Sequence, residues 1–468
     1  MNTSDIMKPA HRLEAGNGGR ERTLSELIIS VSGLRGIVGD TLTPEIVARY
    51  ATAFAAEAPA GTLLVTRDGR DSGQMFSQIV SRALHEVGRD VLDGGIAATP
   101  TTGVLIRELH CAGGIQISAS HNPAQYNGLK LFSAMGRVIS AEEGESVLTR
   151  FRASSEQVEC GLEPANATVI DDQESHLERV ANTIDVQGIR QHRFRVLLDS
   201  NHGAGSRLGK QLLDRLGCEI VLLGGEPDGQ FEHLPEPTAE NLRDTCQRVA
   251  RSGVNVGFCQ DPDADRLAVI DQRGNYVGEE YTLALCVEHA LRHKPGPIVT
   301  NCSTSRMSQD LAEKHGVRFH RSAVGEANVV DKMVSEEAVF GGEGNGGPID
   351  PEVGYVRDSF VGMARILDAM ASRQMTVSEL VGELPKYAIR KTKVELDRSH
   401  FVDTFARLEE HFPEAQSDRL DGLRLDWPDQ WALIRASNTE PIVRIVVEAK
   451  TQQAAHGLCD TLRKQVED

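Results

Sequence analysis

The sequence predicts an α/β protein with several domains, and three observations lead to this prediction. The 468 residues are more than one hydrophobic core usually serves, which indicates three or four domains. Strand and helix patterns alternate through most of the chain, which favours mainly parallel sheets covered by helices. The pattern then changes to that of a smaller α+β unit. The expected parts are a mobile leader over 1–27 and domains over 28–185, 186–294, 295–385 and 386–468.

The first unit alternates strands and helices and closes with a charged helix. Its first helix is supported by the helical spacing of Ile46, Val47, Tyr50, Ala51 and Phe54. Its expected elements are a strand and loop over 28–38, helices over 44–58, 72–87 and 141–153, and strands over 62–69, 113–120 and 127–132.

The second and third units continue the alternation, with a Pro-Gly-Pro linker at 295–297 between them. The letters show no clear repeat. In the second unit we expect strands over 193–200, 218–229, 254–261 and 266–271, a glycine loop leading into a helix over 201–217, and a helix over 239–252. In the third we expect strands over 297–301, 317–322 and 338–343, and helices over 304–314 and 326–335. The last unit has the order strand, helix, two short strands around Asp429-Gln430, strand, helix.

The composition excludes some classes of function. A net charge of −18 argues against a nucleic-acid partner, although a locally positive site can still bind a small anion. No apolar run approaches the ~20 residues of a membrane span, and the N-terminal stretch lacks the apolar core of a signal peptide. The eight cysteines form no CxxC pair, which indicates reduced thiols. We therefore expect a cytoplasmic protein without nucleic-acid or membrane partners.

Residues 118–123 read SASHNP, directly after an expected strand. Asn-Pro is ordinary turn chemistry, so a plain loop is one interpretation. The other is a nucleophilic hydroxyl, that of Ser120, exposed on the loop. A phosphoryl group carried by Ser120 would explain a nearby metal site and arginines, because these would offset its charge. His121 and Lys130 are the neighbouring proton carriers, and a lysine near a metal and arginines can have a lowered pKa and act as a base. A surface lysine is the alternative.

Residues 261–267 read DPDADRL and place three carboxylates within five positions. Asp261, Asp263 and Asp265 would repel one another unless a cation lies among them. Oxygen ligands of this kind suit Mg²⁺, which leaves positions open to phosphate oxygen or water. The adjacent Arg266 could add a positive charge, and a solvated polar turn is the alternative.

Three further loops carry polar side chains at the ends of strands. In GGEGNGG (341–347) the glycines allow close approach of a ligand, and Glu343 and Asn345 suit a polyhydroxylated sugar ring. In SGLRG (32–36) an exposed Arg35 can reach a ligand. In RASNTEPIVR (435–444) the donors for a phosphate group are Arg435, Ser437, Asn438, Thr439 and, on the following strand, Arg444. Plain turns and solvent-facing arginines are the alternatives for each.

The order of the stretches SGLRG, SASHNPAQYNGLK, DPDADRL, GGEGNGG and RASNTEP resembles that of the α-D-phosphohexomutases. This family includes phosphoglucomutase, phosphomannomutase and phosphoglucosamine mutase, and the likeness runs from about residue 28 to 466. The resemblance implies a four-domain, heart-shaped architecture of three related α/β domains and a smaller C-terminal α+β domain around a cleft. It also implies an isomerase that moves a phosphoryl group between O6 and O1 of a hexose phosphate, with a hexose bisphosphate as intermediate and activator.

The same resemblance implies a role for each residue singled out above. Ser120 would be carried as phosphoserine and would bind Mg²⁺ together with Asp261, Asp263 and Asp265. Glu343 and Asn345 would hold ring hydroxyls. The transferred phosphoryl group would be surrounded by Arg35, His121, Lys130 and Arg266, and the other phosphate would be held by Arg435, Ser437, Asn438, Thr439 and Arg444. A mobile last domain, with a hinge near residue 386, would release and recapture the intermediate.

Departures from the family pattern indicate which hexose phosphate is the substrate. Asn345 replaces a more usual serine, which favours an amino-sugar mutase, and Glu326 and Ala327 lie where many relatives carry a basic or histidine side chain. The second acid/base residue is therefore not assigned. We expect interconversion of glucosamine 6-phosphate and glucosamine 1-phosphate by a monomer or homodimer. The alternatives are a phosphomannomutase/phosphoglucomutase, a phosphatase with Asp261 as phosphoryl acceptor, and a non-catalytic sugar-phosphate sensor.

Overall fold

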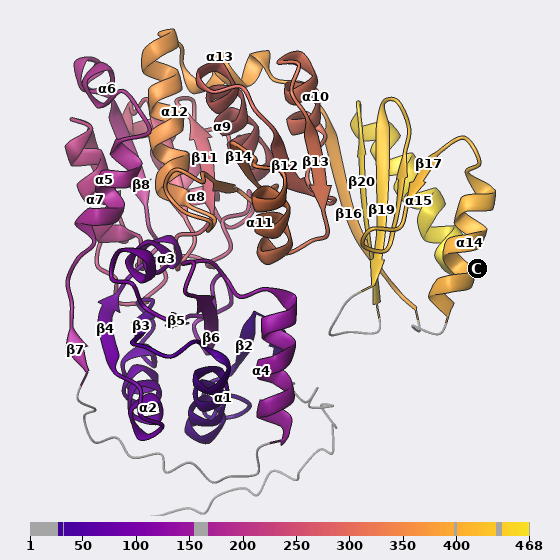
Figure 1. The fold of residues 1–468 in the computed structure, drawn as a ribbon. Coiled ribbons are helices and arrows are strands. Elements are labelled where there is room, and N and C mark those ends of the chain that lie inside the picture. Colours follow the sequence, from indigo (N-terminus) through magenta and orange to yellow (C-terminus); the bar gives the residue numbers. More distant parts are fainter. Residues whose placement is uncertain (1–26, 31, 154–166, 397–399, 437–441, 468) are drawn as a thin grey trace, which may run out of the picture.

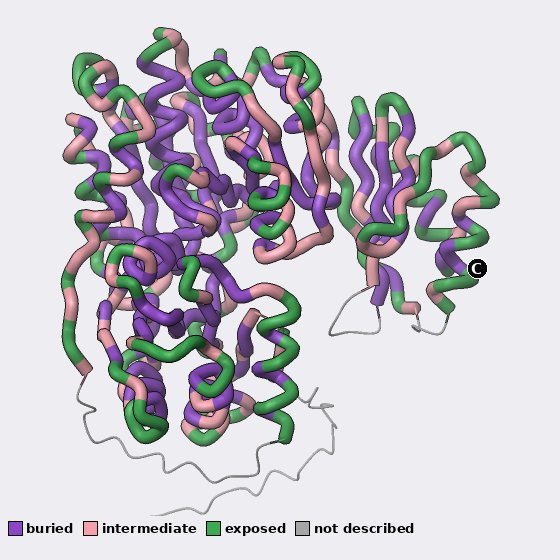
Figure 2. The backbone as a smooth tube through the Cα atoms, viewed as in Figure 1, coloured by how far each residue is buried: buried purple, intermediate pink, exposed green. Residues whose placement is uncertain are grey.

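The computed structural model describes residues 27–30, 32–153, 167–396, 400–436 and 442–467. Four sheets follow one another along the chain (Figure 1). Figure 2 shows that the strands are largely buried while the outer turns of the helices are exposed. Within the described ranges, no helix combines the length and the apolar character needed to cross a membrane.

The first sheet has the strand order β1-β2-β6-β5-β3-β4-β7. Its strands are β1 (Ile28–Ser30), β2 (Gly33–Ile37), β3 (Leu63–Arg67), β4 (Val91–Ile96), β5 (Gly113–Ile117), β6 (Tyr126–Ser133) and β7 (Thr168–Val169). Its helices are α1 (Pro44–Glu57), α2 (Gly73–Glu86), α3 (Thr99–Glu108) and α4 (Ala141–Ala153). Helix α1 begins where the Thr43 side chain accepts a hydrogen bond from the Ile46 amide and Pro44 occupies the first turn, which is a favourable N-terminal arrangement.

The second and third sheets have the orders β11-β10-β8-β9 and β13-β12-β14-β15. The second unit contains α5 (Glu174–Ala181), α6 (Val186–His192), β8 (Arg195–Asp199), α7 (Ser206–Arg215), β9 (Glu219–Leu223), α8 (Arg243–Ser252), β10 (Val256–Gln260) and β11 (Leu267–Asp271). The third contains α9 (Glu279–His293), β12 (Ile298–Asn301), α10 (Met307–Lys314), β13 (Phe319–Ser322), α11 (Glu326–Ser335), β14 (Phe340–Glu343), β15 (Gly347–Ile349), α12 (Ser359–Arg373) and α13 (Val377–Glu383). One continuous hydrophobic cluster joins the two units through α9 and α12.

The last sheet is antiparallel, with the order β16-β20-β19-β18-β17 and a core of its own. Its elements are β16 (Ala388–Glu395), α14 (Phe401–His411), β17 (Gln416–Asp418), β18 (Leu423–Asp426), β19 (Gln430–Ala436), β20 (Ile442–Ala449) and α15 (Gln452–Glu467). This unit lies beside the third one (Figure 1), and the Arg321–Asp426 ion pair, at 3.3 Å, is one of the contacts between them.

The first three sheets share one feature that positions the site. In each, a strand of the parallel part turns back into an antiparallel neighbour: β5 into β6, β10 into β11, and β14 into β15. The three turns carry the serine, aspartate and glycine-rich stretches. The sheets are therefore parallel at their centres, as expected, and antiparallel where the polar loops lie.

The expected elements are present with some bounds shifted, but several observed elements were not expected. The helix expected over 239–252 begins at Arg243, because the preceding residues form a turn closed by the Leu242 amide on the Thr238 carbonyl. The stretch 28–38 contains two paired strands. The sequence patterns did not identify helices α9 and α12, which fill the shared core. They also did not identify the smaller elements β4, α3, β7, α5, α6, β15, α13 and β17.

Candidate active site

The serine loop between β5 and β6 is held by an arginine that lies about 50 residues earlier in the chain. Arg70 pairs with Asp68 at 3.1 Å, and the Ser118 hydroxyl donates to the same carboxylate at 2.7 Å. The guanidinium also donates to four main-chain carbonyls of the loop, those of Ser120 (2.7 Å), Asn122 (2.6 Å), Pro123 (2.7 Å) and Tyr126 (3.1 Å). The sequence pattern did not single out Arg70.

Ser120 faces inward from this loop. Its backbone φ is 47°, a left-handed conformation that non-glycine residues adopt rarely. Its hydroxyl lies 3.2 Å from Asp261 Oδ2 and 3.2 Å from His121 Nδ1. Ser120 is only 2% exposed. The expectation of an exposed hydroxyl is therefore wrong: the tip of the loop at residues 123–125 is exposed, but Ser120 packs against the aspartate loop of the second unit.

The aspartate loop between β10 and β11 brings its three carboxylates together. Asp261, Asp263 and Asp265 are fully buried, and one oxygen of each lies within 4.8 Å of the others. The intervening Ala264 has a φ of 56°, a left-handed conformation, and its amide donates to the Asp261 carbonyl at 2.9 Å, which closes the turn.

This donor set fits a divalent cation. Asp263 Oδ1 and Asp265 Oδ1 are buried without a hydrogen-bond partner, which is costly unless a ligand satisfies them. Burial and the charges of Asp263 and Asp265 raise the pKa of Asp261 well above its usual value. A divalent cation with oxygen ligands would relieve both costs.

Basic side chains surround the carboxylates. Lys130, on β6, lies 3.0 Å from Asp263 Oδ2 and 3.1 Å from Asp265 Oδ2. Burial acts to lower the pKa of Lys130, but these two carboxylates raise it above its usual value. A cation bound by the same carboxylates would oppose this rise, so the lowered pKa expected for Lys130 beside a metal stays a prediction.

Arg35, His121 and Arg266 complete this side of the site. Arg35 Nη1 donates to Asn122 Oδ1 at 3.2 Å. The Arg266 guanidinium lies about 4 Å from Asp261 and Asp265, and its buried Nε has no hydrogen-bond partner. Burial and the charges of Arg266 and Arg35 lower the pKa of His121 to about 3, so its ring is neutral here.

Arg357, which follows β15, connects the aspartate loop to the glycine-rich loop. Its guanidinium contacts Asp265 Oδ2 at 2.6 Å, Glu343 Oε2 at 3.0 Å and Glu326 Oε2 at 3.3 Å. Glu326 thus balances the charge of Arg357 at the position where the family pattern suggested a basic residue. Sequence reasoning missed Arg357, because it lies in no glycine loop and far along the chain from its partners.

Glu343 and Asn345 both lie at the β14–β15 turn. Glu343 Oε1 accepts hydrogen bonds from Asn301 Nδ2 at 2.7 Å and from the Gly325 amide at 3.2 Å. Asn345 Nδ2 approaches Glu343 Oε2 at 3.4 Å, while its buried Oδ1 has no partner. An unpaired carbonyl oxygen is an acceptor ready for a ligand N–H or O–H.

A row of cations crosses the sheet of the last unit. Lys393, Arg444 and Arg435 occupy directly opposite positions on β16, β20 and β19, so their side chains share one face. With Lys391 they line a pocket of about 550 Å³ that also includes Ser303 and Val324 of the third unit. Arg435 is partly engaged by Asp421 at 2.8 Å. The expected phosphate donors Ser437, Asn438 and Thr439 lie outside the described residues. Neither Lys391 nor Lys393 was identified from the sequence.

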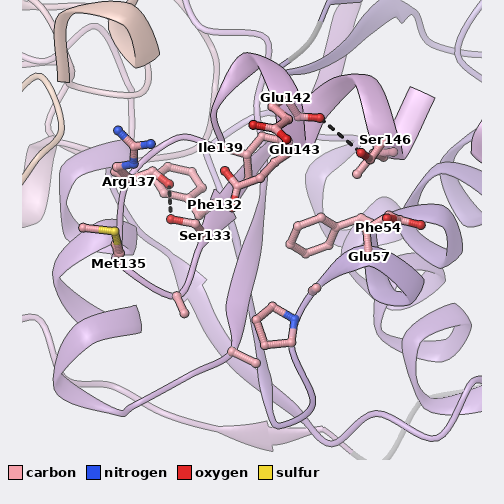
Figure 3. Close-up of a pocket in the computed structure, with 15 residues that line it drawn as sticks. Phe54, Glu57, Phe132, Ser133, Met135, Arg137, Ile139, Glu142, Glu143 and Ser146 are labelled. Carbon is pink, nitrogen blue, oxygen red and sulfur yellow. Dashed lines mark hydrogen bonds between the residues drawn. The ribbon is translucent and has the colours of Figure 1, made fainter. Parts of the chain in front are cut away.

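Another pocket, of about 340 Å³, lies in the first unit between α1, α4 and the end of β6. Figure 3 shows its lining, which includes Phe54, Met135 and the carboxylates of Glu57, Glu142 and Glu143. The one basic side chain of the lining, Arg137, is paired with Asp331 at 2.5 Å. The three acids therefore disfavour a phosphorylated ligand. The loops described above, not this pocket, therefore form the candidate active site.

Comparisons with known proteins cover nearly the whole chain. Models of the phosphoglucomutase/phosphomannomutase family match it at residues 27–158 (α/β/α domain I), 174–274 (domain II), 278–387 (domain III) and 392–465 (C-terminal domain). A protein of Thermococcus kodakarensis named phosphoglucomutase/phosphomannomutase is 36% identical over 438 residues, 90% of this chain and 94% of its own. A phosphoglucosamine/phosphogalactosamine mutase of Sulfurisphaera tokodaii is 32% identical over 453 residues, 94% of this chain and 99% of its own. A solved structure of a phosphoglucomutase/phosphomannomutase family protein from Burkholderia thailandensis is 27% identical and superposes with a TM-score of 0.82, covering 94% and 98% of the two chains.

Proposed function

Because the chain belongs to the phosphoglucomutase/phosphomannomutase family of α-D-phosphohexomutases, we propose that it interconverts glucosamine 6-phosphate and glucosamine 1-phosphate. Ser120 carries the transferred phosphoryl group. The observation that supports this most is the position of the Ser120 hydroxyl, 3.2 Å from Asp261 Oδ2 and beside buried carboxylate oxygens that lack partners.

The reaction has two half-reactions of the same chemistry. A hydroxyl oxygen of the sugar phosphate attacks the phosphorus on Ser120, the bond between phosphorus and Ser120 Oγ breaks, and a hexose bisphosphate forms. The attacking hydroxyl loses its proton, and Ser120 Oγ gains one. After the bisphosphate has turned round, Ser120 Oγ takes the other phosphoryl group by the reverse of these steps. His121 Nδ1, 3.2 Å from Ser120 Oγ, is suitably placed to pass a proton to or from that oxygen.

The chain's own residues supply mainly positioning and charge, which is what phosphoryl transfer needs from a protein. Asp261, Asp263 and Asp265, with the Ser120 phosphate, would hold a Mg²⁺ ion. When bound, that ion would neutralise charge on the transferring phosphoryl group. Arg35, Lys130 and Arg266 would offset the remaining negative charge.

The second phosphate of the substrate would lie on the last unit. The row of Lys393, Arg444 and Arg435 gives three positive side chains on one face of a chain with a net charge of −18. Such a row supports a phosphate clamp formed together with Ser437, Asn438 and Thr439. Because β16 follows α13 after a short connection, we also propose that this unit moves about a hinge near residue 386.

Two observations favour the amino sugar. Curated relatives include the phosphoglucosamine/phosphogalactosamine mutase of Sulfurisphaera tokodaii. In addition, the unpartnered Asn345 Oδ1, next to the Glu343 carboxylate, suits an ammonium donor better than a neutral hydroxyl, because hydrogen bonds from charged donors are the stronger ones.

The test is turnover on glucosamine, glucose and mannose 1-phosphates, with Mg²⁺ and a trace of the matching bisphosphate. The proposal predicts a strong preference for the glucosamine substrate, and in Asn345→Ala that preference should fall by about tenfold. Equal or faster turnover of glucose or mannose 1-phosphate would instead support a phosphoglucomutase/phosphomannomutase. That second candidate is favoured by the name of the Thermococcus kodakarensis relative.

A further inference from the structure

Helices α9 and α12 carry a cluster of metal-ligating side chains that the proposed reaction does not use. His289 and His293 lie four residues apart on α9, which places both on one face of the helix. Asp368 faces them from α12, and one ligand atom from each residue lies within 4.8 Å of the others. The two helices pack side by side in the upper part of Figure 1. Imidazole nitrogens and a carboxylate oxygen are typical ligands of Zn²⁺.

The buried part of the cluster already has the spacing of a metal site. His289 Nε2 donates a hydrogen bond to Asp368 Oδ2 at 3.0 Å. Two ligand atoms that each lie ~2.0 Å from a tetrahedral Zn²⁺ are about 3.3 Å apart. A metal ion can therefore replace the shared proton with only a small movement of either side chain.

The position of His293 and the charges around the cluster also favour binding of a metal ion. The ring centroids of His289 and His293 are 4.4 Å apart, and the exposed His293 can rotate towards the ion without disturbing the core. His293 is the last residue of α9, where the helix dipole favours a cation. Arg365 acts on His289, and its charge is balanced by Asp350 at 2.6 Å. The other basic side chains near His289 are also paired, Arg292 and Lys314 with Glu288 and Arg373 with Glu383.

We propose that His289, His293 and Asp368 bind one Zn²⁺ ion per chain, with water as the fourth ligand. The ion would tie together two helices that fill the core shared by the second and third units. Helix α9 is 15 residues long, so the site lies about 20 Å from the end of α9 that adjoins the glycine-rich loop. The Zn²⁺ ion should therefore affect the stability of the fold and not the rate of turnover.

The experiment uses the full chain without an affinity tag, stripped with EDTA and then supplied with excess Mg²⁺ to occupy the aspartate loop. Titration with Co²⁺ should give the visible absorption of a four- or five-coordinate ion at one equivalent per chain. Zn²⁺ should displace the Co²⁺ and raise the midpoint of thermal unfolding.

Two variants and a matched control test the ligand set. His293→Ala should abolish both the absorption and the thermal shift, and because His293 is exposed the fold is retained. Asp368→Asn keeps an acceptor for His289 but should weaken Co²⁺ binding by about tenfold or more. His411→Ala, which also removes an exposed histidine from the end of a helix, should retain both signals. Failure of the unmodified chain to bind Co²⁺, binding abolished by Mg²⁺, or equal binding by His293→Ala would each overturn the proposal.

Discussion

Replacing Arg70 with lysine should remove some of the hydrogen bonds that hold the serine loop in place. The guanidinium makes five hydrogen bonds, one to Asp68 and one to each of four loop carbonyls. A lysine ammonium can donate at most three. At least two bonds from a charged donor are therefore lost, at ~1.5–3 kcal/mol each, so the free energy of unfolding should fall by about 3–6 kcal/mol.

Activity should fall as well, because all four carbonyl partners belong to the serine loop and two of them are those of Ser120 and Asn122. A displacement of Ser120 by about 1 Å is expected to lower kcat/KM by about a hundredfold. Denaturant unfolding and steady-state turnover measure the two effects on the same preparation.

The matched control is Arg89→Lys. The Arg89 guanidinium also donates to several main-chain carbonyls, including those of Pro59 and Ala58, but these lie after α1, outside the candidate active site. That variant should lose some stability and keep its turnover. Unchanged kcat/KM in Arg70→Lys, or an equal loss in Arg89→Lys, would refute the view that Arg70 positions Ser120.

The other predictions concern the nucleophile, the metal loop and the pH dependence of stability. Ser120→Ala should abolish turnover while the thermal midpoint stays near that of the unmodified chain; residual mutase activity would exclude Ser120 as phosphoryl carrier. Asp263→Asn should raise the Mg²⁺ concentration needed for half-maximal activity by at least tenfold, and an unchanged requirement would count against this ligand. Burial raises the pKa of Glu280 from 4.5 to about 8, so the folded state retains a proton that the unfolded chain releases. Stability should therefore decrease as the pH rises from about 5 to about 8. Glu280→Gln should flatten that decrease in thermal-unfolding scans, and an unaltered slope would contradict the assignment.

The sequence predicted the loops of the candidate site because each carries its chemistry within a few residues. The alternating carboxylates of 261–265 and the serine of 118–123 both follow expected strands, and the structure brings them to within hydrogen-bond distance. The strand patterns also predicted the parallel centres of the sheets. The antiparallel returns were not expected, because β6, β11 and β15 each have the residue pattern of an ordinary strand, which does not reveal the direction of pairing.

The site residues that the sequence did not reveal lie far along the chain from the loops that they contact. Arg70 and Arg357 contact their loops from about 50 and 92 positions away, and a lone arginine in a turn has no distinguishing local pattern. Lys391 and Lys393 lie on a strand where alternating charge is typical of an exposed face. The burial of Ser120 and the raised pKa of Lys130 depend on packing between units, which periodicity within one unit cannot predict.

The most direct test of the proposed mechanism is the fate of a labelled phosphoryl group. The chain is incubated with radiolabelled glucose 1,6-bisphosphate and Mg²⁺, the phosphorylated site is mapped by mass spectrometry, and the labelled protein is then given glucosamine 6-phosphate. The account predicts acid-stable label on Ser120 that passes to the sugar phosphate. Label found on Asp261, or label on Ser120 that does not transfer to any hexose phosphate, would contradict it.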